Sequence, residues 1–264
     1  MMALKGIDIS NWNGNIDFER VKKDGVQFVI VRGGWSTEQD PKAAEYLAQC
    51  NKLGLPVGLY WFSYALNEAD ARAEAQACLA LARKFRIEYP IAYDFEDDSI
   101  AYFNRMGKTC TKELATAIVN AFIAEIAKAG YYVVNYSNNN FLTNWLGKIN
   151  APLWLAAWYI QQPDRPCQMW QYSSTGKING ITGNVDMNLS YVDFPEYLRK
   201  HGYNFLEEAP WIKQASEWAK DGVDFCVKNG ILEGKGGDNY ALKDNLTREE
   251  FCTMLKRYYD KFGG

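Results

Sequence analysis

The sequence predicts an α/β fold: an irregular, TIM-like β/α barrel with helices sparse after the fifth strand, and then a small, mostly α-helical C-terminal domain. Through the first 145 residues, short apolar runs alternate with amphipathic stretches, as is typical of parallel strands joined by helical crossovers. Three further apolar runs follow, with loops between them. Eight strands in this order favour a closed or nearly closed barrel. An open, doubly wound sheet is the alternative, although no Gly-rich dinucleotide motif follows the first run.

The expected strands are apolar runs bounded by turn-forming residues. They lie at 6–10, 28–32, 56–62, 91–95, 131–137, 153–157, 168–172 and 185–189. The expected helices of the barrel lie at 16–23, 42–53, 68–85 and 111–129. Asn67 and Thr111 are suitable N-caps for the last two, while Gly54 and Gly130 follow the second and the fourth.

The domain organisation follows from a change in pattern near residues 201–204. We expect a barrel domain at 1–203 and a second domain at 204–264, in which 211–229 has the pattern of an amphipathic helix. Thr247 and Glu250 have capping-box spacing and open a last helix. A unit of this size is small for independent stability, so we expect docking or oligomerisation through the C-terminal domain.

Charge and composition exclude several classes of protein. The chain has 264 residues with 29 Lys and Arg against 32 Asp and Glu, so we expect neither a nucleic-acid nor an anionic-membrane partner. No apolar run is as long as a membrane span. The single histidine, His201, argues against zinc sites rich in histidine and against a Ser-His-Asp triad. The first residues lack the features of a secretory signal, so we expect synthesis in the cytoplasm.

Two acids on the fourth expected strand are the sharpest candidates for chemistry. In β/α barrels, functional residues collect at the C-terminal ends of the strands. Asp94 and Glu96 lie two apart and therefore on one face, with Cα atoms about 7 Å apart. Such proximity raises the pKa of one acid. A protonated acid beside an ionised one is what glycoside cleavage requires.

Two further acids are expected near the same cavity. Asp8 and Asp186 lie on the first and last strands, which are neighbours in a closed barrel. Four carboxyl groups in one cavity must share protons, hydrogen bonds or a cation. Two other interpretations stay open: residues 94–98 form a solvated acidic loop, or the acids bind magnesium or calcium.

Aromatic residues gather at the same strand ends. Aromatics make up 15% of the chain, and flat amphipathic rings suit the faces of sugars. The candidates are Tyr60, Trp61, Tyr136 and Trp158, and Arg32 lies with them. Packing in the core is the alternative for about half of such rings. These residues favour a sugar substrate over the other interpretations of the acids.

Seven ordered blocks of the chain resemble the glycoside hydrolase family 25 lysozymes. The blocks lie at 6–14, 28–34, 58–62, 93–96, 153–156, 170–172 and 185–188, and the resemblance runs over roughly residues 3–200. It implies an irregular β/α barrel and cleavage of the β-1,4 bond between N-acetylmuramic acid and N-acetylglucosamine in peptidoglycan. It also implies net retention through substrate assistance, with no cofactor and no metal.

The resemblance also implies roles for the candidate residues. Glu96 would be the general acid and base, and Asp94 would orient the 2-acetamido group of the substrate. Asp8 and Asp186 would hold that pair and tune its pKa values. The sugar groove would be lined by Tyr60, Trp61, Trp158, Tyr136 and Arg32. The stretch 33–36 and Trp158 depart from the usual family pattern, which bears on the shape of the sugar subsites and not on the chemistry.

Residues 211–260 resemble a single S-layer-homology repeat, which implies binding to a secondary cell-wall polymer. A small docking or dimerising appendage is the alternative. Together with the expected cytoplasmic synthesis, the resemblances imply a phage endolysin that acts on the bacterial cell wall. A prophage origin or another export route stays open. The rival functions are a non-catalytic glycan-binding protein and a metal-dependent hydrolase on the same barrel.

Overall fold

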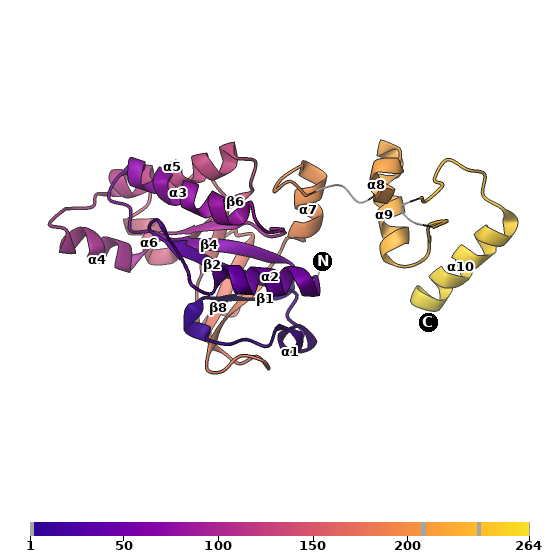
Figure 1. Cartoon of the computed structure of the whole chain (residues 1–264), viewed down its shortest axis with the longest axis horizontal. Helices are drawn as coiled ribbons and strands as arrows, with labels where there is room; N and C mark the ends of the chain where they lie inside the picture. The colour runs from indigo at the N-terminus through magenta and orange to yellow at the C-terminus, as the bar shows by residue number, and fades with distance from the viewer. Residues whose placement is uncertain (1–2, 207–209, 237–238, 264) are drawn as a thin grey trace. The chain divides into compact units, whose positions relative to one another are not determined.

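The computed structural model describes residues 3–206, 210–236 and 239–263. The chain divides into two compact units, Met1–Leu206 and Glu207–Gly264. Each unit is described by itself, and Figure 1 gives the elements of both. Among the described residues, no helix is long and apolar enough to cross a membrane.

The first unit is a closed, mixed β-barrel, as the sequence predicts. Its strands are β1 (Leu4–Ile9), β2 (Phe28–Trp35), β4 (Val57–Phe62), β5 (Ile91–Asp94), β6 (Val133–Asn138), β7 (Leu153–Ala156), β8 (Met169–Gly176) and β9 (Val185–Ser190). The order is β1-β9-β8-β7-β6-β5-β4-β2, and β1 pairs with β2 to close the ring. A short strand, β3 (Glu38–Gln39), extends β2 as a hairpin.

Strand direction differs from the expectation in the last part of the barrel. The pairs from β1 through β2, β4, β5, β6 and β7 to β8 are parallel, but β9 is antiparallel to both β8 and β1. No helix lies between β8 and β9. Because a hairpin connection needs no crossover, the chain turns back after β8 and enters the last gap in the reverse direction.

The helices of the barrel cluster among the early strands. They are α1 (Phe18–Lys23), α2 (Ala43–Leu53), α3 (Glu68–Ala82), α4 (Asp97–Arg105), α5 (Lys112–Lys128), α6 (Asn139–Asn144) and α7 (Phe194–His201), with a 3-10 turn, η1 (Asn11–Asn13). The caps predicted at Asn67 and Thr111 are confirmed, since both side chains accept backbone N–H bonds. The short helices α4, α6 and α7 were not among the expected elements.

The core has two layers that determine where a cavity can lie. One layer packs between the strands and the surrounding helices. The other fills the barrel interior, where Phe28 stacks on Tyr89 at 4.3 Å and Tyr89 contacts Phe194 of α7 at 5.2 Å between ring centroids. Gly6 is required there because a Cβ would lie 2.3 Å from the Phe28 ring. These rings fill the end of the barrel where the parallel strands begin.

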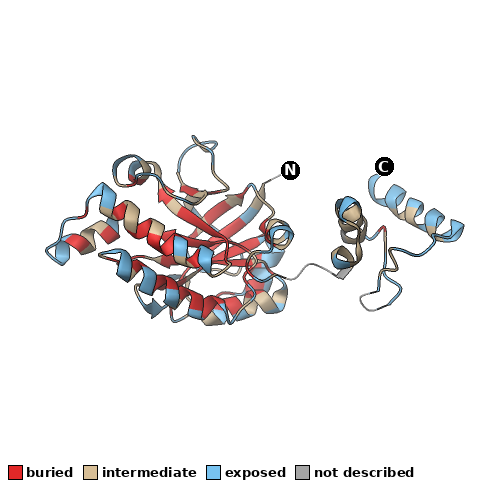
Figure 2. Cartoon of the chain, turned by 90° about the horizontal axis from the view of Figure 1, so that it is seen from above, coloured by how far each residue is buried: buried red, intermediate tan, exposed pale blue. Residues whose placement is uncertain are grey.

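The second unit contains α8 (Pro210–Gln214), η2 (Glu217–Ala219), α9 (Lys220–Lys228) and α10 (Arg248–Phe262). The single helix expected at 211–229 is therefore wrong: Ser216 is extended and interrupts it. The capping box of Thr247 and Glu250 is confirmed at the start of α10. Figure 2 shows buried residues throughout the barrel but few in this unit, where Ile231 is the one buried apolar side chain among the described residues.

Candidate active site

A cavity of about 280 Å³ opens at the end of the barrel opposite the filled interior. It is lined by Asp8, Arg32, Tyr60, Phe62, Asp94, Glu96, Tyr136, Trp154, Trp158, Gln171 and Asp186. The structure thus brings together all four predicted acids and four of the five predicted substrate-binding residues. Trp61 is the exception.

Asp94 and Glu96 enter the cavity together because the backbone stays extended beyond the strand. β5 ends at Asp94, but Glu96 has φ −142° and ψ −161° as the N-cap of α4. Side chains therefore continue to alternate between the two faces beyond Asp94. Phe95, between the two acids, is buried in the core on the other face. The solvated acidic loop is excluded: Asp94 is 6% exposed, and Asp97 and Asp98 form the first turn of α4, where negative charge is favourable.

Asp8 and Asp186 lie directly opposite each other as register partners of β1 and β9. Asp186 is the second residue of β9, so it does not lie at a C-terminal strand end like the other candidate acids. It still reaches the cavity because β9 runs against its neighbours. The antiparallel direction of this strand brings its beginning to the mouth of the barrel.

Asp8 holds a proton in this pair. Its Oδ2 accepts hydrogen bonds from Gln171 Nε2 at 2.9 Å and Asn188 Nδ2 at 2.7 Å. Burial and the charge of Asp186 raise the pKa of Asp8 to about 8 despite these two donors. Burial raises the pKa of Asp186 to about 6, and a hydrogen bond with Asp8 opposes that rise. Near neutral pH, Asp8 is therefore the proton carrier and Asp186 the ionised partner.

The other two acids are also less acidic than usual. Burial, then the charges of Glu96 and Asp8, raise the pKa of Asp94 well above its ordinary value, while Arg32 lowers it. Burial raises the pKa of Glu96 to about 7, with contributions from Asp97, Asp98 and Asp186. Asp94 Oδ1 is buried and has no hydrogen-bond partner among the described residues. The site therefore offers a proton donor at neutral pH beside an unpaired acceptor oxygen.

Gln171 connects the cavity wall to the acids, and it was not among the predicted site residues. Its carbonyl oxygen accepts bonds from Tyr136 Oη and Trp158 Nε1, both at 3.1 Å, and its amide donates to Asp8. It is 3% exposed. The signal in the sequence was a polar residue within the apolar run 168–172. Through this one amide, Tyr136 and Trp158 of the cavity wall are connected to Asp8.

Arg32 is held at the edge of the cavity by an ion pair. Its Nε lies 2.8 Å from Asp40 Oδ2, and its guanidinium also donates to Asn11 Oδ1. The guanidinium carbon lies 5.0 Å from the ring centre of Trp35, within cation–π range. Asp40 is fully buried. These contacts leave Arg32 little rotamer freedom, so its charge faces the site from a defined position.

The expected role of Trp61 in the sugar groove is wrong. Its side chain is 1% exposed and packs in the layer between strands and helices, and its Nε1 donates to the carbonyl of Ser36 at 2.7 Å. Tyr60 and Phe62 line the cavity instead. Because neighbouring residues of a strand point to opposite faces, Trp61 must point away when they point in.

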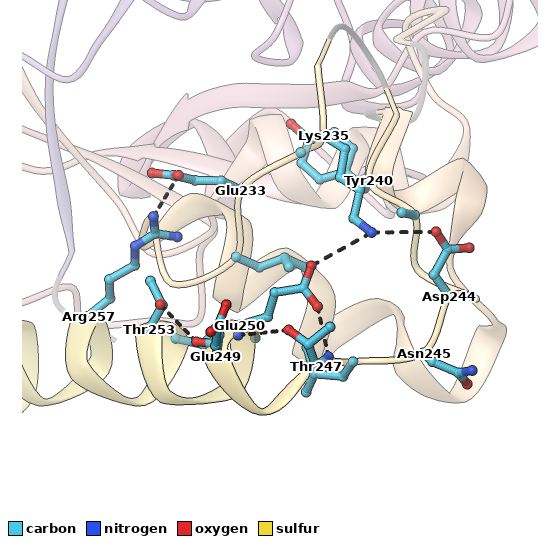
Figure 3. A pocket seen from close by; sticks show the side chains of 15 residues that line it. Glu233, Lys235, Tyr240, Asp244, Asn245, Thr247, Glu249, Glu250, Thr253 and Arg257 are labelled. Atoms are coloured by element: carbon cyan, nitrogen blue, oxygen red, sulfur yellow. Dashed lines mark hydrogen bonds and ion pairs between the residues drawn. The ribbon is translucent and has the colours of Figure 1, made fainter.

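A second cavity, of about 530 Å³, lies within the C-terminal unit beside the start of α10 (Figure 3). The cations that line it are paired: Arg257 contacts Glu233 at 2.7 Å, and Lys235 lies 3.6 Å from Asp244 and 3.7 Å from Glu250. Across the described residues of both units, no group of three or more His, Cys, Asp or Glu side chains is arranged to hold a metal ion.

Two family models match the two parts of the chain separately. The family model described as glycosyl hydrolases family 25 matches residues 7–181, and the S-layer homology domain model matches 212–252. Lysozyme M1 of Streptomyces globisporus is 27% identical over 205 residues, which cover 70% of this chain and 67% of that protein. The autolytic lysozyme of Clostridium acetobutylicum is 26% identical over 190 residues, covering 70% of this chain and 55% of that protein.

A solved structure gives the same result for the barrel. The modular autolysin LytC from Streptococcus pneumoniae superposes with a TM-score of 0.63 at 32% identity, over 72% of this chain and 47% of that one. The chain thus spans about half the length of these longer relatives. The family 25 match extends over more than half of the chain and confirms the resemblance seen in the sequence. The chain belongs to glycosyl hydrolases family 25, with a C-terminal S-layer homology domain.

Proposed function

We propose that the chain is a peptidoglycan muramidase, a lysozyme that hydrolyses the β-1,4 bond between N-acetylmuramic acid and N-acetylglucosamine with net retention. One observation carries the proposal: a single cavity holds Asp94 and Glu96 on consecutive inward positions, and burial raises the pKa of Glu96 to about 7. Family membership and the lysozyme names of its relatives support this choice.

In the first step, Glu96 donates its proton to the glycosidic oxygen as that bond breaks. The carbonyl oxygen of the substrate's own 2-acetamido group attacks the anomeric carbon and forms a cyclic, positively charged intermediate. Asp94 accepts a hydrogen bond from the acetamido N–H with its unpaired Oδ1, which orients the acetamide for this attack. Substrate assistance of this kind is a known exception to the two-carboxylate scheme.

In the second step, Glu96 is ionised and takes a proton from a water molecule. That water attacks the anomeric carbon and opens the cyclic intermediate. Two inversions at the anomeric carbon give net retention. Asp186 faces Glu96 as a negative charge and favours the return of the proton. Tyr60, Tyr136 and Trp158 supply cavity surface for the sugar rings, and Arg32 supplies the positive charge that offsets Asp94.

The test is digestion of purified peptidoglycan by wild type and by Glu96→Gln, with the products identified by mass spectrometry. Wild type is expected to release fragments that end in reducing N-acetylmuramic acid, and Glu96→Gln to release almost none. Glu113→Gln, at an exposed acid of α5, is the matched control and keeps full activity. Full activity in Glu96→Gln, or reducing ends on N-acetylglucosamine, would overturn the assignment.

The same assay separates the two rival functions. A non-catalytic glycan-binding protein would bind walls saturably and release no fragments in any variant. A metal-dependent hydrolase would lose activity in EDTA and regain it with magnesium. We expect EDTA to leave the rate of digestion unchanged, because the proposed steps use only carboxyl groups and the substrate's acetamide.

For the C-terminal unit we propose binding to a secondary cell-wall polymer, supported by the S-layer homology match. The full chain is expected to sediment with intact walls and to sediment less with walls from which the polymer has been extracted by acid. Equal binding to both would assign all wall affinity to the barrel.

We also propose that the C-terminal unit associates with copies of itself through α10. Phe251, Leu255, Tyr258 and Phe262 follow one another at 4-3-4 spacing, the seam of a helix-pairing surface, and each is at least 45% exposed. Light scattering of the full chain is expected to give an oligomer, and Leu255→Lys a monomer. A wild-type monomer at high concentration would exclude this association.

The biological role that fits these two parts is that of a phage endolysin, made in the host cytoplasm and released to the wall through a membrane lesion. Expression in a susceptible bacterium should leave the cells intact until the membrane is permeabilised, and lysis should then follow. Lysis without permeabilisation would favour an exported bacterial enzyme instead.

A further inference from the structure

A buried polar network lies directly behind the strand that carries the two acids. Glu74 of α3 is 1% exposed, and its Oε2 accepts a bond from Tyr93 Oη at 2.6 Å, while its Oε1 accepts one from the backbone N–H of Tyr64 at 2.9 Å. Tyr93 immediately precedes Asp94 and faces the helices. Its ring stacks on Phe122 of α5 at 3.9 Å, which fixes the position of its hydroxyl.

Ser63, which follows β4, joins this network to the backbone of the acids. Its hydroxyl lies 2.7 Å from Tyr93 Oη and donates to it, because the phenolic proton is used on Glu74. Its N–H donates to the carbonyl of Asp94 at 2.9 Å. Its carbonyl accepts a bond from Ser99 Oγ at 2.7 Å. All three polar groups of Ser63 therefore act on one segment, residues 93–99.

Ser99 completes the connection to Glu96. Its hydroxyl accepts the backbone N–H of Glu96 at 3.2 Å, and its own N–H donates to the Glu96 carbonyl at 2.9 Å. Ser63 and Tyr93 are fully buried and Ser99 is 1% exposed, so water does not compete for these bonds. An unbroken series of hydrogen bonds thus runs from the carboxyl of Glu74 to the backbone of Glu96.

We propose that Glu74, Tyr93, Ser63 and Ser99 are positioning residues, which hold Asp94 and Glu96 at the cavity through this network. The inference rests on the proposed muramidase function for its kinetic consequence. None of the four lines the cavity. Their role is to fix the extended backbone at 94–96, on which the orientation of both acids depends, since a shift of about 1 Å in a catalytic group can lower a rate about 100-fold.

The variant that tests the network is Tyr93→Phe, which keeps the stacked ring and removes the hydroxyl shared by Glu74 and Ser63. We expect kcat to fall about 10- to 100-fold per folded molecule, with little change in KM. Glu74→Gln is the conservative variant, because its amide can still bond to the hydroxyl of Tyr93. It should keep most of the wild-type kcat. Tyr132→Phe is the matched control: its hydroxyl bonds to Gln168 near the filled end of the barrel, and its loss should leave kcat unchanged.

A second readout separates this proposal from the proposed function. The titration of Glu96 is followed by carbon NMR of glutamate-labelled protein, with Glu96→Gln to assign the signal. In Tyr93→Phe the titration should move away from the wild-type value, and in Tyr132→Phe it should not. If wild type digests no wall but the titration of Glu96 still moves in Tyr93→Phe, the proposed muramidase function is wrong and the positioning role is supported. If Tyr93→Phe changes neither kcat nor the titration, positioning is overturned.

Discussion

Asp8 and Asp186 are direct register partners across the antiparallel pair of β1 and β9, and one hydrogen bond joins their side chains. The pKa is about 8 for Asp8 and about 6 for Asp186, so the pair carries one proton near neutral pH. The ionised Asp186 raises the pKa of Glu96. The closing strand of the barrel therefore takes part in setting the protonation of an acid on the far side of the cavity.

Asp186→Asn is expected to shift the pH dependence of activity. Glu96 must be protonated to donate, so activity falls as pH rises through its pKa of about 7. Removing the charge of Asp186 lowers that pKa, and the alkaline limb of kcat/KM should move to lower pH. Glu19→Gln, on the exposed side of α1, should leave the profile unchanged. An alkaline limb that stays in place would show that Asp186 does not act on Glu96.

Asp8→Asn is expected to increase stability at pH 8 while lowering activity. The folded-state pKa of Asp8 is raised from 3.8 to about 8, so the stability that its neutral form provides is complete below about pH 4 and is lost as pH rises toward 8. An amide at this position can still accept from Gln171 and Asn188 and carries no charge. Melting temperatures at pH 4, 6 and 8 should show a gain over wild type that grows with pH. A gain of equal size at every pH would contradict the linkage.

Trp61→Ala is expected to lower stability, whereas Trp158→Ala is expected to weaken substrate binding. Trp61 is 1% exposed in the core, so its truncation should cost about 3–5 kcal/mol of the free energy of unfolding, with KM of the remaining folded enzyme unchanged. Trp158 is 42% exposed at the cavity, so its truncation should raise KM and change the free energy of unfolding by less than about 1 kcal/mol. Denaturant unfolding and steady-state kinetics check both. If Trp61→Ala raises KM as much as Trp158→Ala does, Trp61 contributes to the sugar groove after all.

Asp40→Ala is expected to destabilise the barrel because it leaves Arg32 without its counter-charge. The side chains of Arg32 and Asp40 are 14% and 1% exposed. Breaking a buried pair by removing one partner costs about 3–5 kcal/mol. Combining Asp40→Ala with Arg32→Met should recover part of that loss in urea unfolding. A double variant no more stable than Asp40→Ala would mean that the damage comes instead from the backbone bonds Asp40 accepts at Asn11 and Lys42.

The strands of the barrel and the pair Asp94 and Glu96 could be predicted from the sequence because both depend on local pattern. Apolar runs bounded by glycine and proline define the strands, and alternation along one strand places Asp94 and Glu96 together. The misassignment of Trp61 has a physical cause in the same pattern. The run 57–62 is apolar throughout, since the strand is covered on both faces, and such a run does not reveal which residues point inward.

Long-range features could not be predicted in this way. The reversed direction of β9 depends on how the chain returns after β8. The hydrogen bonds that Gln171 makes depend on the register of strands that are distant in sequence. Helix α4 was hidden because its first turn, Asp97 and Asp98, resembles a polar loop until its position at a helix N-terminus is known. A polar residue inside an apolar run, such as Gln171 within 168–172, is a local signal of such a contact.

The antiparallel closure of the barrel has a consequence for synthesis. Asn188 reaches Asp8 across 180 residues of chain, so the proton-sharing pair exists only after almost the whole barrel unit has been made. Pairings of such long sequence separation form late, because loop closure must come first. A partly translated chain holds Asp94 and Glu96 but lacks Asp186, whose charge contributes to the raised pKa of Glu96. The growing polypeptide therefore has no complete set of cavity acids until its first and last strands meet.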